Sequence, residues 1–176
     1  MKKLVFTVVA AFLTTSVVAS DDAGSILESA TGIWKGELYY LDYQSGQRFG
    51  IPMKIEASVT PDGATLVRQL TFTDPGNLVH AISLTTVDRD SGDLVEAYFR
   101  EGKGEFSQAT VTEMAFESET EWMLVYMQDG IDDNKPAVIR NTLRRDGNAL
   151  TSSKEVRFAG ETEFFLRNGF EVELTE

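Results

Sequence analysis

The sequence predicts an all-β domain, most simply one antiparallel meander barrel of about 8–10 strands, with a two-sheet β-sandwich as the alternative. Residues 48–59 place an apolar side chain at every second position, which is the period of a strand with one buried face. Turn signals rich in Pro, Gly, Asn and Asp recur about every 8–12 residues. Beyond residue 31, no long segment has apolar residues at helical spacing. A closed meander is favoured because it removes exposed sheet edges.

The first 20 residues have the composition of an export signal. Lys2 and Lys3 precede an apolar run over residues 4–18, and small residues ending at Ala19 provide a cleavage site. We therefore expect residues 1–20 to be a signal peptide. The processed protein is then expected to be periplasmic or secreted, without a stable membrane anchor.

Charge and cysteine content narrow the class of protein. The 176-residue chain carries 28 acidic and 16 basic side chains, a formal net charge of −12 at pH 7. Such a surface repels nucleic acid and anionic lipid, because phosphate binding requires clustered Lys and Arg. The chain has no Cys, which excludes disulfides and favours a bacterial periplasm or exterior. We expect one acidic, soluble domain with no nucleic-acid partner.

Residues 21–31 are expected to form a lead-in with a short helical turn, which Gly32 ends. The β-barrel domain then spans residues 32–176. Its first two strands, the aromatic-rich segment 33–43 and the alternating segment 48–59, are separated by a short polar turn. They are expected to form a long antiparallel hairpin.

The rest of the chain repeats this unit. Further strands are expected at 64–73, 78–87, 94–100, 106–116, 121–128, 137–145 and 149–158. The segment 129–136 is expected to be the longest polar loop. Residues 161–174 are expected to form one long strand with a bulge at Gly169, because a hairpin at Asn168-Gly169 would leave a short final arm.

The opening of the first strand carries a family resemblance. A Gly-x-Trp sequence, with Gly32 and Trp34 as its Gly and Trp, follows the helical lead-in directly. Gly36 and Tyr40 come after it in the same strand and belong to the same resemblance. This opening resembles that of the lipocalin-like (calycin) β-barrels, in particular small bacterial exported lipocalin-like domains of unknown function. The resemblance implies an internal cavity for a small apolar ligand.

In lipocalin-like proteins the Trp packs across the closed end of the barrel, commonly with a late Arg above it. The resemblance therefore implies that Trp34 lies inside near one end, with Arg157 or Arg167 above it. Fatty-acid-binding relatives hold the ligand carboxylate with an Arg-x-Tyr pair near the C-terminus. Here Arg157 is followed by Phe-Ala and Arg167 by Asn-Gly, a departure that argues against that mode of binding.

Three polar residues are candidates for a ligand anchor inside the barrel. Arg68, His80 and Glu96 each interrupt an alternating apolar face, on three consecutive strands. Adjacent antiparallel strands bring such residues together when their registers align. An inward Arg68 requires a counter-ion, because an unpaired buried charge is costly, and Glu96 is the candidate. We therefore expect Arg68, His80 and Glu96 to converge on the polar head of a mostly apolar ligand.

Four more residues complete the expected ligand-binding set. Tyr98, Trp122 and Tyr126 are large side chains at alternating positions, and they are expected to line the cavity. Arg140 alternates with apolar residues in the same way as Arg68.

Residues 88–93 and 129–134 are acidic loops that depart from the spacing of a calcium site. A single His without Cys cannot build a zinc site. We therefore expect no metal. The sequence has no Gly-rich phosphate loop after a strand, no Gly-x-Ser-x-Gly elbow and no Cys nucleophile, so it assigns no cofactor and no catalytic residue and leans against an enzyme without deciding the question.

Three functions are consistent with these features. The leading one is an exported binding module that holds a small hydrophobic molecule in the barrel. The alternative is a cavity-less envelope or protein-interaction module; the segment 121–128 favours it because both of its faces are apolar, which makes it a candidate homodimer contact. The third is a small-molecule enzyme that uses His80 and Glu96.

Overall fold

The computed structural model describes residues 16–42, 45–88 and 90–175. Most of the expected signal peptide, residues 1–15, lies outside the described residues. Among the described residues, no helix combines the length and apolar character needed to cross a bilayer.

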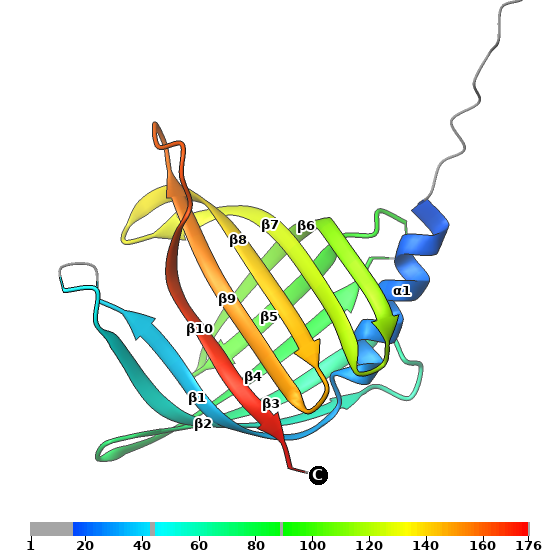
Figure 1. Ribbon diagram of the computed structural model, residues 1–176, viewed down its shortest axis with the longest axis horizontal. Coiled ribbons are helices and arrows are strands. Elements are labelled where there is room, and N and C mark those ends of the chain that lie inside the picture. Colours follow the sequence, from blue (N-terminus) through cyan, green and yellow to red (C-terminus); the bar gives the residue numbers. More distant parts are fainter. Residues whose placement is uncertain (1–15, 43–44, 89, 176) are drawn as a thin grey trace, which may run out of the picture.

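Ten antiparallel strands form one closed barrel, as Figure 1 shows. Each strand pairs with its neighbours in the sequence, and β1 pairs with β10 to close the ring. The strands are β1 (Gly32–Leu41), β2 (Arg48–Val59), β3 (Thr65–Asp74), β4 (Asn77–Val87), β5 (Leu94–Arg100), β6 (Lys103–Ser118), β7 (Glu121–Asp132), β8 (Lys135–Asp146), β9 (Ala149–Phe158) and β10 (Phe165–Leu174). The predicted fold class, a single antiparallel meander barrel, is confirmed.

One helix, α1 (Ser16–Ser29), lies against one end of the barrel (Figure 1). It is longer than the single turn expected from the sequence. Ile26 and Leu27 are buried, and Ala30 just beyond the helix is buried with them. These residues join the main apolar core, which makes this end of the barrel the closed one.

The core fills the part of the barrel nearest α1. Its largest fully buried side chains include Ile26, Trp34, Ile55, Leu66, Leu94 and Leu124. A second, smaller cluster contains Ala137, Ile139 and Val156, with Phe158 and Phe165 packed against it. The core thus comes from α1 and from alternate positions of the strands, as expected for one face of each strand.

The β7–β8 hairpin corrects the expected loop at 129–136. β7 continues to Asp132 and β8 begins at Lys135, so only a two-residue turn separates them. Asp133 and Asn134 both have positive φ, 48° and 58°. Consecutive positive φ values are the geometry of a type I′ hairpin turn, which Asp and Asn tolerate. The extra strand residues bring Asp132 into the barrel wall.

β10 is one continuous strand, as predicted, but it begins at Phe165 and not at residue 161, and its irregularity lies between Leu166 and Asn168, not at Gly169. Gly169 is required for a different reason. A Cβ there would overlap the carbonyl oxygen of Ser152, and the Tyr39 hydroxyl lies close as well. Because Gly has no side chain, Tyr39 can lie against β10 at this point.

The wall of the barrel is not uniformly paired. In the described chain, β6–β7 pairing runs from Ser118–Glu121 to Thr110–Met127. Residues 103–109 of β6 pair with β5, and residues 128–132 of β7 pair with β8. The wall therefore separates between these two segments.

Candidate functional site

The alternation of burial shows which face of each strand points inward. On β4, Ala81, Ser83 and Thr85 are buried, whereas His80 and Ile82 are exposed. Since successive side chains point to opposite sides of a strand, the small residues face the interior and the large ones lie on the outer wall. This is the reverse of the orientation expected for the face that contains His80.

The small inward residues of β4 make room for an arginine. Arg68 Nη2 donates to Ser83 Oγ at 2.9 Å and to Thr85 Oγ1 at 2.7 Å. It also lies 3.5 Å from Glu96 Oε1, and Thr85 Oγ1 donates to the same carboxylate oxygen at 3.2 Å. The expected Arg68–Glu96 contact is therefore present inside the barrel, and neighbouring hydroxyls help to hold it.

Tyr126 lies close to this ion pair. Burial raises the pKa of its phenol far above the ordinary value. The charge of Glu96 raises that pKa further, and the charge of Arg68 lowers it. Tyr126 is therefore a neutral phenol at any physiological pH, and it can offer a hydrogen bond but cannot act as a base.

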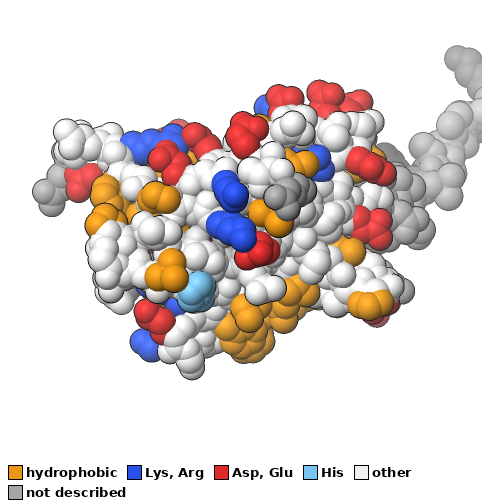
Figure 2. All heavy atoms as spheres, turned by 90° about the horizontal axis from the view of Figure 1, so that it is seen from below, with side chains coloured by type: hydrophobic (Ala, Val, Ile, Leu, Met, Phe, Trp, Pro, Cys, Tyr) orange, Lys and Arg blue, Asp and Glu red, His pale blue; other side chains and the backbone are white. Residues whose placement is uncertain are grey.

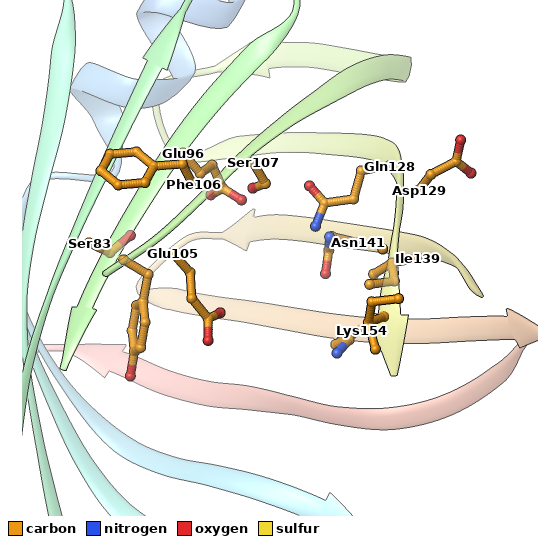
Figure 3. A pocket seen from close by; sticks show the side chains of 13 residues that line it. Ser83, Glu96, Glu105, Phe106, Ser107, Gln128, Asp129, Ile139, Asn141 and Lys154 are labelled. Atoms are coloured by element: carbon orange, nitrogen blue, oxygen red, sulfur yellow. The ribbon is translucent and has the colours of Figure 1, made fainter. Parts of the chain in front are cut away.

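A cavity of about 760 Å³ opens beside this network, at the separation between β6 and β7 (Figure 3). Its lining includes Glu96, Tyr98 and Glu105 from β5 and β6. The facing wall includes Gln128, Asn141 and Lys154 from β7, β8 and β9. Tyr98 therefore lines the cavity, as expected, and burial raises its pKa above the usual value. The volume is within the range of small-molecule sites.

A second polar cluster lies inside the barrel, and sequence reasoning missed it. Asp132 is only 7% exposed, and two cations contact its carboxylate. Lys154 Nζ donates to Asp132 Oδ2 at 2.9 Å, and Arg167 Nη2 lies 2.6 Å from Asp132 Oδ1. Three strands, β7, β9 and β10, supply these residues. The sequence predicts a polar loop at Asp132, and its inward position follows from the greater length of β7.

Among the described residues, the buried side-chain polar atoms without a hydrogen-bond partner include Gln128 Oε1, in the cavity wall, and Arg68 Nε, in the ion-pair network. Such atoms are uncommon, because leaving a buried donor or acceptor unpaired costs about 1–3 kcal/mol. A ligand or bound water that fills the cavity would supply a partner for Gln128.

The structure places two residues of the proposed set on the outer wall of the barrel. His80 is exposed on the outer wall, with its Nδ1 3.3 Å from Thr71 Oγ1. Arg140 also lies on the outer wall, where it forms a two-bond ion pair with Glu155 and stacks over Phe164 at 4.3 Å. Apolar neighbours share the strand face of each residue and predict an inward position, but that face is the outer one. The only His of the chain thus lies outside the cavity.

Trp122 points into the barrel but belongs to the core and not to the cavity. It is 2% exposed and packs in the main apolar cluster near α1.

Trp34 lies inside at the closed end, as the lipocalin-like resemblance implied. It is fully buried, and its Nε1 donates to the Ala30 carbonyl at 3.1 Å. The arginine above it is Arg145, whose guanidinium lies 5.2 Å from the ring, and neither Arg157 nor Arg167 takes this place. Arg145 also donates to the carbonyls of Ser29 and Gly147, which ties α1 to the β8–β9 turn.

We expect Arg68→Met to destabilise the protein by about 1–3 kcal/mol in chemical denaturation, because Glu96 would lose its cation. The range lies below that of a fully buried pair, since the two side chains are 16% and 21% exposed. Arg140→Met is the matched control on the outer wall, and we expect a loss below about 1 kcal/mol. Equal effects of the two substitutions would contradict an interior role for Arg68.

Comparisons with known proteins give information on the fold alone. No protein-family model matches the chain. No curated protein matches it. Among solved structures, the chain is similar to the crystal structure of Rv2717c from M. tuberculosis, with a TM-score of 0.59 and 14% identity over 94% of this chain and 100% of that one. At this identity the likeness shows a common barrel architecture, and the closed barrel is consistent with the lipocalin-like resemblance.

Proposed function

We propose that this protein is a binding module that holds a small amphiphilic molecule in the barrel cavity. The observation that carries the proposal is the cavity of about 760 Å³ between β6 and β7, lined by polar and apolar side chains from both walls. Concave sites with a few fixed polar groups are typical of small-molecule binding. Tyr98 and Ile139 offer apolar surface, and the amides of Gln128 and Asn141 offer hydrogen bonds.

Binding is favoured over catalysis because the groups needed for the enzyme alternative do not meet. That alternative required His80 near Glu96, but His80 lies on the outer wall and Glu96 lies inside. A general base has to be within hydrogen-bond reach of its substrate. Tyr126, close to Glu96, stays neutral because burial raises its pKa.

Export belongs to the same proposal, and it rests on the composition of residues 1–20. Intact-mass measurement of the protein recovered from the periplasm or medium tests it. A product that still begins at Met1 would overturn export without affecting the cavity.

The binding proposal predicts that a bulky side chain placed in the cavity abolishes ligand uptake. Ser107 lines the cavity from β6, and Gln108, the next residue, is exposed on the other face of the strand. We expect Ser107→Trp to weaken binding of the neutral dye Nile red by at least about tenfold, and Gln108→Trp to leave it within about twofold. Fluorescence titration measures both constants. Nile red binding that survives Ser107→Trp unchanged would place the dye elsewhere and overturn the proposal.

A second candidate function, protein interaction, is supported by a different observation. Large apolar side chains are exposed on the outer wall of β4–β6, among them Phe106 (75%), Ile82 (45%) and Phe99 (39%). Figure 2 shows hydrophobic side chains gathered on the face that contains His80. The expected homodimer contact at 121–128 is less exposed, because Val125 is buried and Met123 and Met127 are half-buried. Native mass spectrometry separates the two functions: a dimer without ligand supports interaction, and a bound small molecule supports the cavity.

A further inference from the structure

We propose that Lys154, flanked by Asn141 and Gln128, forms a subsite for the anionic head of the ligand, so that the cavity selects small amphiphilic anions such as carboxylates. This inference rests on the proposed binding function and names its ligand class. The subsite lies on the wall formed by β7, β8 and β9, opposite the Arg68–Glu96 pair.

Register places the three residues next to one another. Lys154 on β9 pairs with Asn141 on β8, and Asn141 pairs with Tyr126 on β7, two residues before Gln128. All three subsite residues line the same cavity. Figure 3 shows the side chains of Asn141 and Lys154 side by side on one wall, with Gln128 close to Asn141. An ammonium and two amides can all donate hydrogen bonds to a carboxylate.

A buried acid holds the ammonium in place. Asp132 accepts from Lys154 Nζ at 2.9 Å, and this carboxylate is 7% exposed. An ammonium has three donors, so the bond to Asp132 fixes its position and leaves others for a ligand. Such support by a fixed neighbour is what makes a polar group effective in a binding site.

Asp132 is shared between Lys154 and Arg167. The Arg167 guanidinium lies 2.6 Å from Asp132 Oδ1. Lys154 bonds the other carboxylate oxygen, Oδ2, and two of its three donors are not used by this bond. In a chain whose formal net charge is −12, an inward ammonium gives the cavity a positive group that attracts a negative ligand.

The opposite wall orients the ligand. Glu105 lies at the exposed edge of the cavity, and Figure 3 shows it across the space from Lys154. Glu96, deeper on the same wall, is already engaged by Arg68 and Thr85. Negative charge on this wall repels an anionic head and directs it to Lys154, while the aromatic ring of Tyr98 offers contact to the apolar part.

The test compares an anionic probe with a neutral one. We expect 8-anilinonaphthalene-1-sulfonate to bind Lys154→Met at least about tenfold more weakly than the wild type, because a charge-assisted contact is lost. Nile red, which has no charge, should change by less than about twofold. Lys35→Met removes the same charge from an exposed position on β1 and serves as the control, with both dyes within about twofold. Glu105→Gln should strengthen binding of the anionic dye by about two- to threefold.

The outcomes separate the subsite from the cavity. Nile red binding that is lost in Ser107→Trp, together with anionic-dye binding that is unchanged in both Lys154→Met and Glu105→Gln, would overturn the subsite and leave the binding proposal standing. Failure of both dyes to bind the wild type would overturn both. If Lys154→Met does not fold, as judged by circular dichroism, Glu105→Gln alone decides: equal or weaker binding of the anionic dye overturns the subsite.

Discussion

Replacing Trp34 with alanine is expected to destabilise the barrel by about 3–5 kcal/mol, the cost of truncating a fully packed aromatic side chain. Trp34 has no exposed surface, and it packs in an apolar core to which both α1 and the strands contribute side chains. Its ring also lies beneath the guanidinium of Arg145. Urea denaturation followed by circular dichroism measures the change in the free energy of unfolding.

Trp34→Phe is the graded control, because it keeps most of the ring but loses the donor to the Ala30 carbonyl. We expect a smaller cost than for alanine, since a Phe ring leaves less of the cavity empty. A loss below about 1 kcal/mol for Trp34→Ala would contradict the packing described for the closed end.

Replacing Arg145 with methionine is expected to cost about 2–4 kcal/mol. The guanidinium donates to the carbonyls of Ser29 and Gly147, and hydrogen bonds to charged groups contribute about 1.5–3 kcal/mol each. The expected loss is below the sum of the two, because burial lowers the pKa of Arg145, which shows that desolvation already opposes the charge. Differential scanning calorimetry and urea denaturation both report the change.

The neighbouring residue provides a matched control. Arg144 is exposed and lies 3.6 Å from Asp146. Arg144→Met should cost less than about 1 kcal/mol, the range of exposed ion pairs. If Arg144→Met and Arg145→Met proved equally costly, the link between α1 and the β8–β9 turn would not stabilise the closed end.

The positions of the strands could be predicted because alternation and turn residues are local signals. The inward face could not be predicted in the same way. On β4 the sequence offers one face with Leu78, His80 and Ile82, and hydrophobicity alone assigns that face to the interior. The interior instead takes the face with Ser83 and Thr85, because Arg68 fills that part of the barrel and requires small hydroxyl neighbours. A period of two identifies two faces but does not say which one is buried.

The charged residues inside the barrel could be predicted only where each one stands between apolar residues on one face of a strand. Arg68 and Glu96 do so, on β3 and β5, which both pair with β4. Asp132, Lys154 and Arg167 come together through the β7–β8 turn, the β8–β9 hairpin and the bulge of β10. That register depends on the two-residue turn at Asp133–Asn134, which resembled part of a longer polar loop in the sequence.

The seam between β1 and β10 has a consequence for folding. It joins the first and the last strand, with Trp34 opposite Leu174 and Tyr40 opposite Asn168. All other strand pairs are hairpins between strands that follow one another in the sequence. Local hairpins form first, since closing a long loop costs entropy before its contacts are gained. Until the seam closes, β1 and β10 are open edges that can pair with another chain. Refolding at high protein concentration therefore favours domain-swapped species, in which β10 of one molecule completes the barrel of a second.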